Sequence, residues 1–248
     1  VDTLWTNRQS AFTHGNYNTV KMRTKTLITS AVLSIAGAAA LQAQVYSVNA
    51  VGYINLDVAP GFNLLANQLN NGDNTVSDLF AGHDMFMSVY KHDATTGAYT
   101  INNYEPPSAP GAGDEFWDDP DMTLSPGEGF WLRNLDASGF TLTLVGEVPQ
   151  GMLEVGIEPG YNLVASPVPQ AGLLQTDLGL PVQDFDSVLR HSPTVPSPGL
   201  GDTGTYTSYE TDDAGWLTEE PMVEVGEGIW FRNLNDAKTW TRDFNVNE

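Results

Sequence analysis

A tryptophan and an arginine stand two residues apart at two equivalent places in the chain, in the phrases "GEGFWLRN" and "GEGIWFRN". In an extended strand, residues two apart face the same side, so each tryptophan would lie beside its arginine. Such a pair can make a cation–π contact, and exposed rings can stack on a sugar. The candidate ligand-binding side chains are Trp131, Arg133, Trp230 and Arg232. The default alternative is packing in a core or between modules, because aromatic side chains fill the cores of all-β proteins.

A glutamate between two glycines lies at the start of each phrase. Glu128 and Glu227 are therefore the strongest candidates for the carboxylate pair of a glycoside hydrolase. The sequence alone does not pair them, since 30 of the 31 acidic residues fall in positions 44–248 and close pairs arise by chance. The default interpretation of both is a solvated acid in a turn.

Acidic residues also gather around Trp117 and Trp216. Ca²⁺ takes 6–8 oxygen ligands and tolerates irregular loops, so calcium is the one cofactor that the sequence suggests. The candidate ligands are Asp114, Asp118, Asp119 and Asp121 in the first loop, and Asp212 and Asp213 in the second. Their spacing matches no EF-hand, and a solvated acidic loop is the default interpretation.

Histidine-based or serine-based catalysis has little support in the sequence. His92 and His191 occupy the same position in two copies of a repeat, after Lys91 and Arg190, which favours a structural role at a strand end. The chain has no Gly-x-Ser-x-Gly and no His-Glu-x-x-His motif. We therefore predict no catalytic residue.

The repeated phrase belongs to a longer repeat. "GFNLLANQL" returns as "GYNLVASPV", and "SVYKH" returns as "SVLRH", each 99 residues later. The offset changes only in stretches rich in proline, glycine and serine, where loops tolerate insertions. A period near 100 residues is the size of a domain, so we predict two homologous modules at 50–149 and 150–248, packed against each other.

Each module has the pattern of short antiparallel strands. Positions 53–58 alternate between apolar and polar residues, positions 85–92 and 97–104 resemble a hairpin, and 76–82 suits one short helix capped by Ser77 or Asp78. Turn residues recur every 8–12 positions. The predicted fold is all-β, with two tandem antiparallel barrels or sandwiches of about six strands each and at most one short helix per module.

The first 43 residues are expected to lie outside this fold. Met22 begins a segment with two early basic residues, an uncharged apolar run of 15 residues and an Ala–Gln cleavage point, which is the layout of a secretory signal peptide at 22–43. The run is short for a membrane span of about 20 residues. Positions 1–21 are interpreted as read-through upstream of the native start. We expect a secreted protein, extracellular or in the cell envelope, with no membrane insertion once the leader is removed.

Charge and composition exclude several partners. Residues 44–248 hold 30 acidic and 6 basic residues, a formal net charge of −24. Nucleic acids and anionic lipids are repelled by such a surface, because phosphate binding needs lysine and arginine. The chain has no cysteine, which excludes a thiolate nucleophile, a thiolate metal site and disulfides.

The motifs Gly-aromatic-Asn-Leu and Gly-x-Gly-aromatic-Trp resemble those of a tandem β-module found in exported and cell-surface proteins of bacteria. They occur here from Gly61 and Gly127, and again from Gly160 and Gly226; the second copy departs in having Val225 before its glycine and Ile229 at the aromatic position. The resemblance covers nearly all of 44–248. It implies an all-β fold and export, and it assigns no catalytic residue.

Taken together, these patterns predict a secreted, non-enzymatic protein of two β-modules that serves as an interaction or structural component outside the cell. The first alternative is a carbohydrate-binding module that uses exposed tryptophan or tyrosine, with calcium as a stabilising ion. The second is a glycoside hydrolase. The partner would be a glycan or another surface protein, and the sequence does not fix the oligomeric state.

Overall fold

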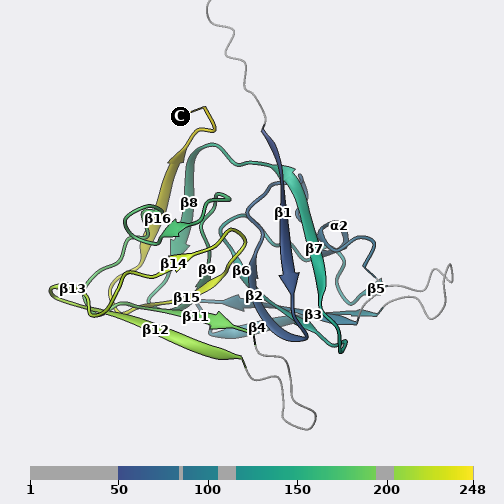
Figure 1. Cartoon of the computed structure of the whole chain (residues 1–248), viewed down its shortest axis with the longest axis horizontal. Helices are drawn as coiled ribbons and strands as arrows, with labels where there is room; N and C mark the ends of the chain where they lie inside the picture. Colours follow the sequence, from purple (N-terminus) through teal and green to yellow (C-terminus); the bar gives the residue numbers. More distant parts are fainter. Residues whose placement is uncertain (1–49, 84–85, 106–115, 194–203, 248) are drawn as a thin grey trace, which may run out of the picture. The chain divides into compact units, whose positions relative to one another are not determined.

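Antiparallel β-strands make up nearly all of the fold, which confirms the predicted class. The computed structural model describes residues 50–83, 86–105, 116–193 and 204–247 (Figure 1). The upstream stretch, the predicted leader and the candidate ligand Asp114 lie outside these residues. The one helix within them, α2 (Val76–Leu79), falls far short of the length and apolar character that a membrane span requires.

Each half of the described chain contains six strands of five or more residues, together with shorter ones. The first half holds β1 (Val51–Val58), β2 (Gly61–Ala66), β3 (Met87–Asp93), β4 (Ala98–Glu105), β5 (Phe116–Trp117), β6 (Gly129–Asn134) and β7 (Phe140–Glu147). The second half holds β8 (Gly151–Ile157), β9 (Gly160–Val164), β10 (Gly172–Leu173), β11 (Ser187–Ser192), β12 (Thr205–Asp212), β13 (Gly215–Trp216), β14 (Met222–Val223), β15 (Ile229–Asn233) and β16 (Lys238–Phe244).

Both halves use the same strand order. One five-stranded sheet runs β2-β6-β3-β4-β5, and the corresponding sheet of the second half runs β9-β15-β11-β12-β13. The first and last long strands of each half pair separately, as β1–β7 and β8–β16. In Figure 1 these two pairs stand across the layer that contains β3, β4, β11 and β12. No sheet of the described residues closes into a barrel, so each half is sandwich-like.

A separate core lies inside each sandwich. In the first, Ile54, Leu56 and Val58 of β1 are buried on alternate positions, as the sequence pattern predicts. They pack on the inner face of the five-stranded sheet, where Phe130 and Leu132 of β6 are also buried. The second core is built in the same way, and its largest buried side chains are Trp240 and Phe231.

The helix α2 confirms the prediction of one short helix, but its predicted cap was wrong. Thr75 is the N-cap residue, with extended backbone angles, and its hydroxyl accepts a hydrogen bond from the Asp78 amide at 3.4 Å. Ser77 and Asp78 already have helical geometry within α2. An N-cap needs extended backbone immediately before the first turn, which only Thr75 provides.

Candidate functional site

The repeated Gly-Glu-Gly phrase lies where the two halves join. The Ala66 amide donates to the Gly226 carbonyl at 2.9 Å, and the equivalent Ala165 amide donates to the Gly127 carbonyl at 3.0 Å. The halves therefore exchange the same backbone hydrogen bond in both directions. The buried Gln68 adds a second link, since its side chain accepts from the Gly226 amide at 2.7 Å.

Glycine is required at these positions because atoms of the other half of the chain lie so close that a Cβ atom has no room. Gly127 and Gly226 have positive φ values of 95° and 79°. A Cβ atom on Gly127 would lie 2.5 Å from Val155, and one on Gly228 would lie 2.7 Å from the Leu65 carbonyl oxygen. The sequence predicts the positive φ, but not that the glycines make room for the other half of the molecule.

The two glutamates of the phrase brace their own turns. Glu128 accepts from Lys91 Nζ at 3.0 Å and from the Ser125 amide at 2.8 Å. Glu227 accepts from Arg190 Nε at 2.7 Å, from its Nη2 at 2.8 Å, and from the Glu224 amide at 3.0 Å. Each carboxylate is thus held by a cation of the neighbouring strand and by its own turn, which describes a structural ion pair.

Outside the two cores, a third apolar cluster covers the opposite faces of the five-stranded sheets. Its buried members are Leu64, Trp131 and Leu163, so both halves contribute. Trp131 is 6% exposed, and Trp230 is partly buried against the cluster. The sequence correctly predicts that these tryptophans face away from Phe130 and Phe231. Their surroundings match the default alternative, packing between modules.

Nine rings form one continuous contact network on this side, which we call the aromatic face. Its members are Phe62, Tyr90, His92, Tyr99, Trp131, Tyr161, His191, Tyr206 and Trp230. Each tryptophan meets the histidine of the other half: Trp131 lies 4.7 Å from His191, and Trp230 lies 4.8 Å from His92, centroid to centroid. The network therefore repeats the reciprocal pattern of the backbone bonds.

The arginines of the candidate pairs stack on rings other than the tryptophans. Arg133 lies over Phe62 at 5.2 Å, and Arg232 lies over Tyr161 at 5.7 Å. In both cases the ring belongs to the residue directly opposite on the adjacent strand. Such neighbours have Cβ atoms about 5 Å apart, whereas residues two apart on one strand are separated by about 6.6 Å. Each arginine therefore makes this cation–π contact across strands, and its predicted contact with the tryptophan of its own strand stays a prediction.

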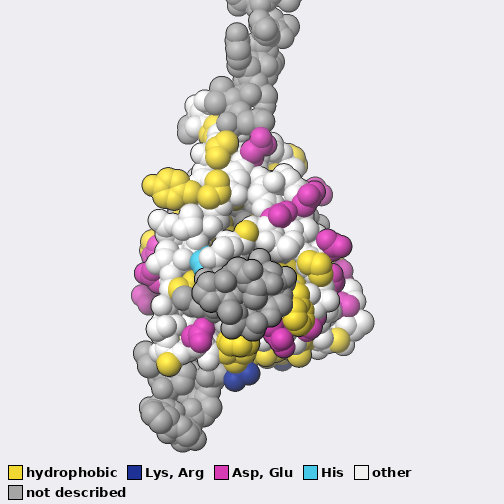
Figure 2. Space-filling model, turned by 90° about the vertical axis from the view of Figure 1, so that its right-hand side faces the viewer, with side chains coloured by type: hydrophobic (Ala, Val, Ile, Leu, Met, Phe, Trp, Pro, Cys, Tyr) yellow, Lys and Arg dark blue, Asp and Glu magenta, His cyan; other side chains and the backbone are white. Residues whose placement is uncertain are grey.

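A cleft of about 550 Å³ opens in the aromatic face. We call it the aromatic cleft; its lining residues are Phe62, Tyr90, Tyr99, Ile101, Trp131, His191, Gly204 and Tyr206. Tyr99 is 45% exposed and Tyr206 is 51% exposed, while Trp131 is buried behind them. Figure 2 shows hydrophobic side chains gathered at the lower edge of the molecule, with a basic side chain beside them. Both halves contribute to the cleft, and Leu189 in the second half stands where the first has Tyr90.

The two histidines of the aromatic face are poorly solvated. The Nδ1 atom of each is buried without a hydrogen-bond partner. Burial lowers the pKa of both imidazoles; for His92 the nearby charge of Asp93 opposes that shift. Burial also raises the pKa of Tyr99 and Tyr206, whose hydroxyls each have a tryptophan side chain as hydrogen-bond partner. At neutral pH these rings are therefore uncharged.

The histidines should make stability fall in mild acid. Because their pKa is lowered in the folded state, the unfolded chain binds more protons as the pH drops below about 6.5, and the folded state loses stability from there downward. We expect the free energy of unfolding, measured in urea, to fall less between pH 7.5 and pH 5.5 in the variant His92→Gln/His191→Gln than in the parent protein. An equal loss in both proteins would contradict the assignment.

Of the candidate calcium ligands that the structure describes, Asp212 is partly buried and the others are exposed, and they are not gathered into one group. The Asp118 carboxylate accepts from the Asn103 side chain at 2.8 Å, and that of Asp119 from the Asp121 amide at 3.2 Å. Asp212 accepts from the Ala214 amide at 2.8 Å. Among the described residues, no three or more histidine or acidic side chains are arranged to hold a metal. Calcium binding by these loops, including Asp213, stays a prediction of the sequence.

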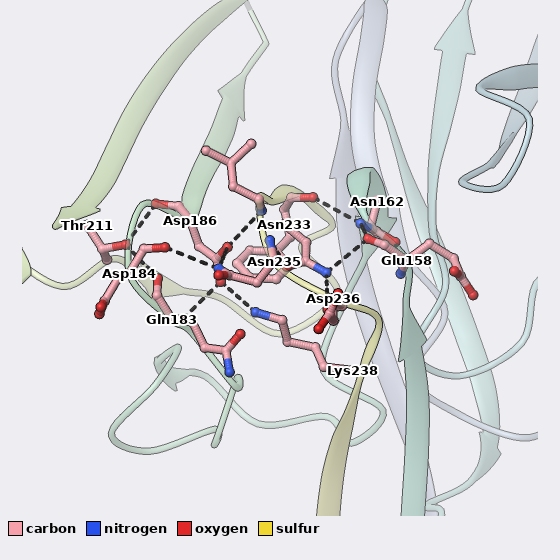
Figure 3. Close-up of polar contacts among 12 residues, drawn as sticks. Glu158, Asn162, Gln183, Asp184, Asp186, Thr211, Asn233, Asn235, Asp236 and Lys238 are labelled. Atoms are coloured by element: carbon pink, nitrogen blue, oxygen red, sulfur yellow. Dashed lines mark hydrogen bonds and ion pairs between the residues drawn. The ribbon is translucent and has the colours of Figure 1, made fainter. Parts of the chain in front are cut away.

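A buried polar network in the second half was missed by the sequence analysis (Figure 3). The Asp186 side chain is fully buried and accepts from Lys238 Nζ at 2.7 Å. It also accepts from the amides of Leu234 and Gln183, both at 2.9 Å, and from the Asn235 side chain at 3.0 Å. Three of these bonds, from Leu234, Asn235 and Lys238, fasten the residue before β11 to the β15–β16 region, and the fourth closes the loop that begins at Gln183. The bonds join separate parts of the fold, so the network has a structural role.

The structure thus brings Trp131 and Trp230 into one aromatic face, and it places Arg133 and Arg232 over neighbouring rings of that face. Searches against protein-family models, curated protein sequences and solved structures find no match for this chain.

Proposed function

We propose that this protein is a non-catalytic binding protein, exported from the cell, whose ligand site is the aromatic cleft. The observation that carries the proposal is the composition of the cleft: five aromatic rings from two halves of the chain line one hollow of about 550 Å³. Ligand sites have this character, being concave, mostly apolar and about 300–1,000 Å³ in volume. The arrangement would also follow from an ancestral duplication, with the site formed at the junction of the copies.

Two further features support binding over catalysis. The described side chains that line the cleft carry three tyrosine hydroxyls, one indole N–H and one imidazole as their polar groups. Glu128 and Glu227, the candidate carboxylates for glycoside hydrolysis, form ion pairs with Lys91 and Arg190. Export is supported by the predicted leader and by the net charge of −24 in residues 44–248. We place the protein at or outside the cell surface, as an interaction component.

Carbohydrate binding is the second candidate, and a specific observation favours it. Beyond the cleft, Tyr161 is 50% exposed, with Trp230 at 6.0 Å and the Arg232 guanidinium at 5.7 Å from its ring. An exposed ring beside hydrogen-bond donors can stack on a sugar and orient its hydroxyls. A glycan bound at Tyr161 would support this candidate.

The proposed site is tested by the indole N–H resonances of the tryptophans in NMR spectra. The probes are a soluble β-glucan oligomer, phenol and choline, added separately. We expect at least one probe to shift the Trp131 resonance saturably, and we expect Tyr206→Ala to weaken that probe's binding at least fivefold, because the ring forms one wall of the cleft. Tyr53→Ala is the matched control, since Tyr53 is 73% exposed on β1 and lies outside the cleft.

The cleft is not the binding site if none of the three probes shifts the Trp131 resonance. The same conclusion follows if Tyr206→Ala and Tyr53→Ala weaken the binding of a probe equally. A probe that shifts Trp230 and is lost on Tyr161→Ala would move the site to the second half.

A further inference from the structure

Several ring pairs of the aromatic cleft stand nearly at right angles. The interplanar angle is 86° between Phe62 and Trp131, 85° between Tyr90 and Tyr99, and 83° between Trp131 and Tyr206, whereas Phe62 and Tyr90 are tilted at 56°. A pyranose ring stacks its C–H face on one broad aromatic plane. Perpendicular rings instead form the walls of a box, which encloses a compact, rounded group on several sides.

The hydrogen-bonding groups of the cleft are few. Among the described lining side chains they are the hydroxyls of Tyr90, Tyr99 and Tyr206, the Trp131 indole N–H and the His191 imidazole. A sugar buries several hydroxyls, and each one that finds no partner costs free energy. A quaternary ammonium group has no N–H or O–H to satisfy, so its entry costs only its hydration, which contact with several ring faces offsets.

The charge of the protein favours a cation in the cleft. Residues 44–248 carry a net charge of −24, and among the described residues that line the cleft there is no lysine or arginine. On the side shown in Figure 2, acidic side chains are spread widely. A field of this sign raises the local concentration of cations.

The rings of this protein already accept cations elsewhere. The Arg232 guanidinium lies 5.7 Å from the Tyr161 centroid, and Lys238 Nζ lies 5.5 Å from the Phe231 centroid. One resident cation would repel a cationic ligand. The Arg133 guanidinium lies 5.2 Å from the centroid of Phe62, a residue that lines the cleft. Its charge should weaken the binding of a cation there without abolishing it, because several other rings also enclose the bound group.

We propose that the aromatic cleft binds a methylated ammonium group by cation–π contacts with the rings of Phe62, Tyr90, Tyr99 and Tyr206. The inference rests on the proposed binding function and names its ligand class. Aromatic boxes that recognise quaternary ammonium groups work by this contact, which is strongest when the cation is desolvated.

The test compares choline with its neutral isostere 3,3-dimethyl-1-butanol, which has the same shape and no charge. Both are titrated into the full chain while the Trp131 indole resonance is followed. We expect choline to bind at least tenfold more tightly than the isostere. We expect Tyr99→Leu and Tyr206→Leu each to reduce choline affinity at least fivefold, and Arg133→Gln to raise it about twofold to threefold, because a repelling charge is removed.

The acid response gives a second readout that a purely apolar site would not show. Protonation of His191 adds a positive charge to the wall, so choline affinity should fall as the pH is lowered through the titration of His191, below about 6.5, while the affinity for the isostere stays constant. The rings around His191 are Trp131 at 4.7 Å and Tyr206 at 5.3 Å, and the carboxylates of Asp57, Glu224 and Glu227 line a second hollow with it.

Equal affinity for choline and its isostere overturns the cation inference and leaves the cleft as an apolar binding site. Binding of the glucan oligomer at Trp131 without any effect of choline also overturns it, in favour of the sugar. If none of these compounds shifts Trp131, the proposed function itself fails.

Discussion

Replacing Gly127 and Gly226 together with alanine is expected to leave little folded protein. Both residues have a positive φ, which costs about 1–2 kcal/mol for an alanine. Each new methyl group also meets a packed side chain, Val155 in one case and Leu56 in the other, and overpacking of this kind costs about 1–3 kcal/mol. The summed loss of about 4–10 kcal/mol is comparable to the whole stability of a typical domain, about 5–15 kcal/mol.

The chain offers matched controls for this experiment. Gly72 and Gly215 have positive φ values of 106° and 110°, but an added Cβ atom would meet nothing within 4 Å. The variant Gly72→Ala/Gly215→Ala therefore carries the backbone strain without the clash, and it should lose about 2–4 kcal/mol. Urea unfolding followed by tryptophan fluorescence measures both double variants. If they lose the same free energy, close approach between the halves does not explain the repeated glycines.

The second large effect is expected at the buried ion pair of Asp186 and Lys238. Removing one partner of a buried pair leaves the other charge unpaired, which costs about 3–5 kcal/mol. Asp186→Ala also strips an acceptor from the amides of Leu234 and Gln183. We expect a loss in that range for Asp186→Ala, and a similar loss for Lys238→Met, in urea unfolding at pH 7.5.

The control for this pair is the more exposed ion pair of the first half. Lys91 and Glu128 have side chains that are 31% and 38% exposed, and such pairs contribute about 0–1 kcal/mol. Glu128→Gln should therefore cost no more than about 1 kcal/mol. The double variant Asp186→Met/Lys238→Met should cost less than the sum of its single changes, because no lone charge remains buried. Equal effects of Asp186→Ala and Glu128→Gln would contradict this account.

Local patterns in the sequence predict most of the architecture. Alternation in 53–58 places Ile54, Leu56 and Val58 in the first core, because a strand with one buried face must alternate. Alternation in the repeated phrase separates Phe130 from Trp131 in the same way. Two copies of one pattern also imply two copies of one strand order, and both five-stranded sheets have it.

The parts that were missed depend on residues far apart in the chain. His191 meets Trp131 across 60 positions, and no local pattern reports such a contact. Arg133 stacks on Phe62 because of strand register, which alternation alone does not fix. The sequence does not single out Asp186, because an aspartate next to a strand has the pattern of an ordinary loop acid. Its buried role depends on four hydrogen-bond donors, three of which come from residues 234–238.

The exchanged contacts between the halves have the geometry of an isologous interface. Ala66 bonds Gly226 as Ala165 bonds Gly127, and Trp131 touches His191 as Trp230 touches His92. A patch that is complementary to itself is what joins two identical subunits about a two-fold axis. Two such subunits fused into one chain would each be free to change on their own. The two halves do differ, with Tyr90 in one and Leu189 in the other, so the scaffold resembles a homodimer with unlike sides.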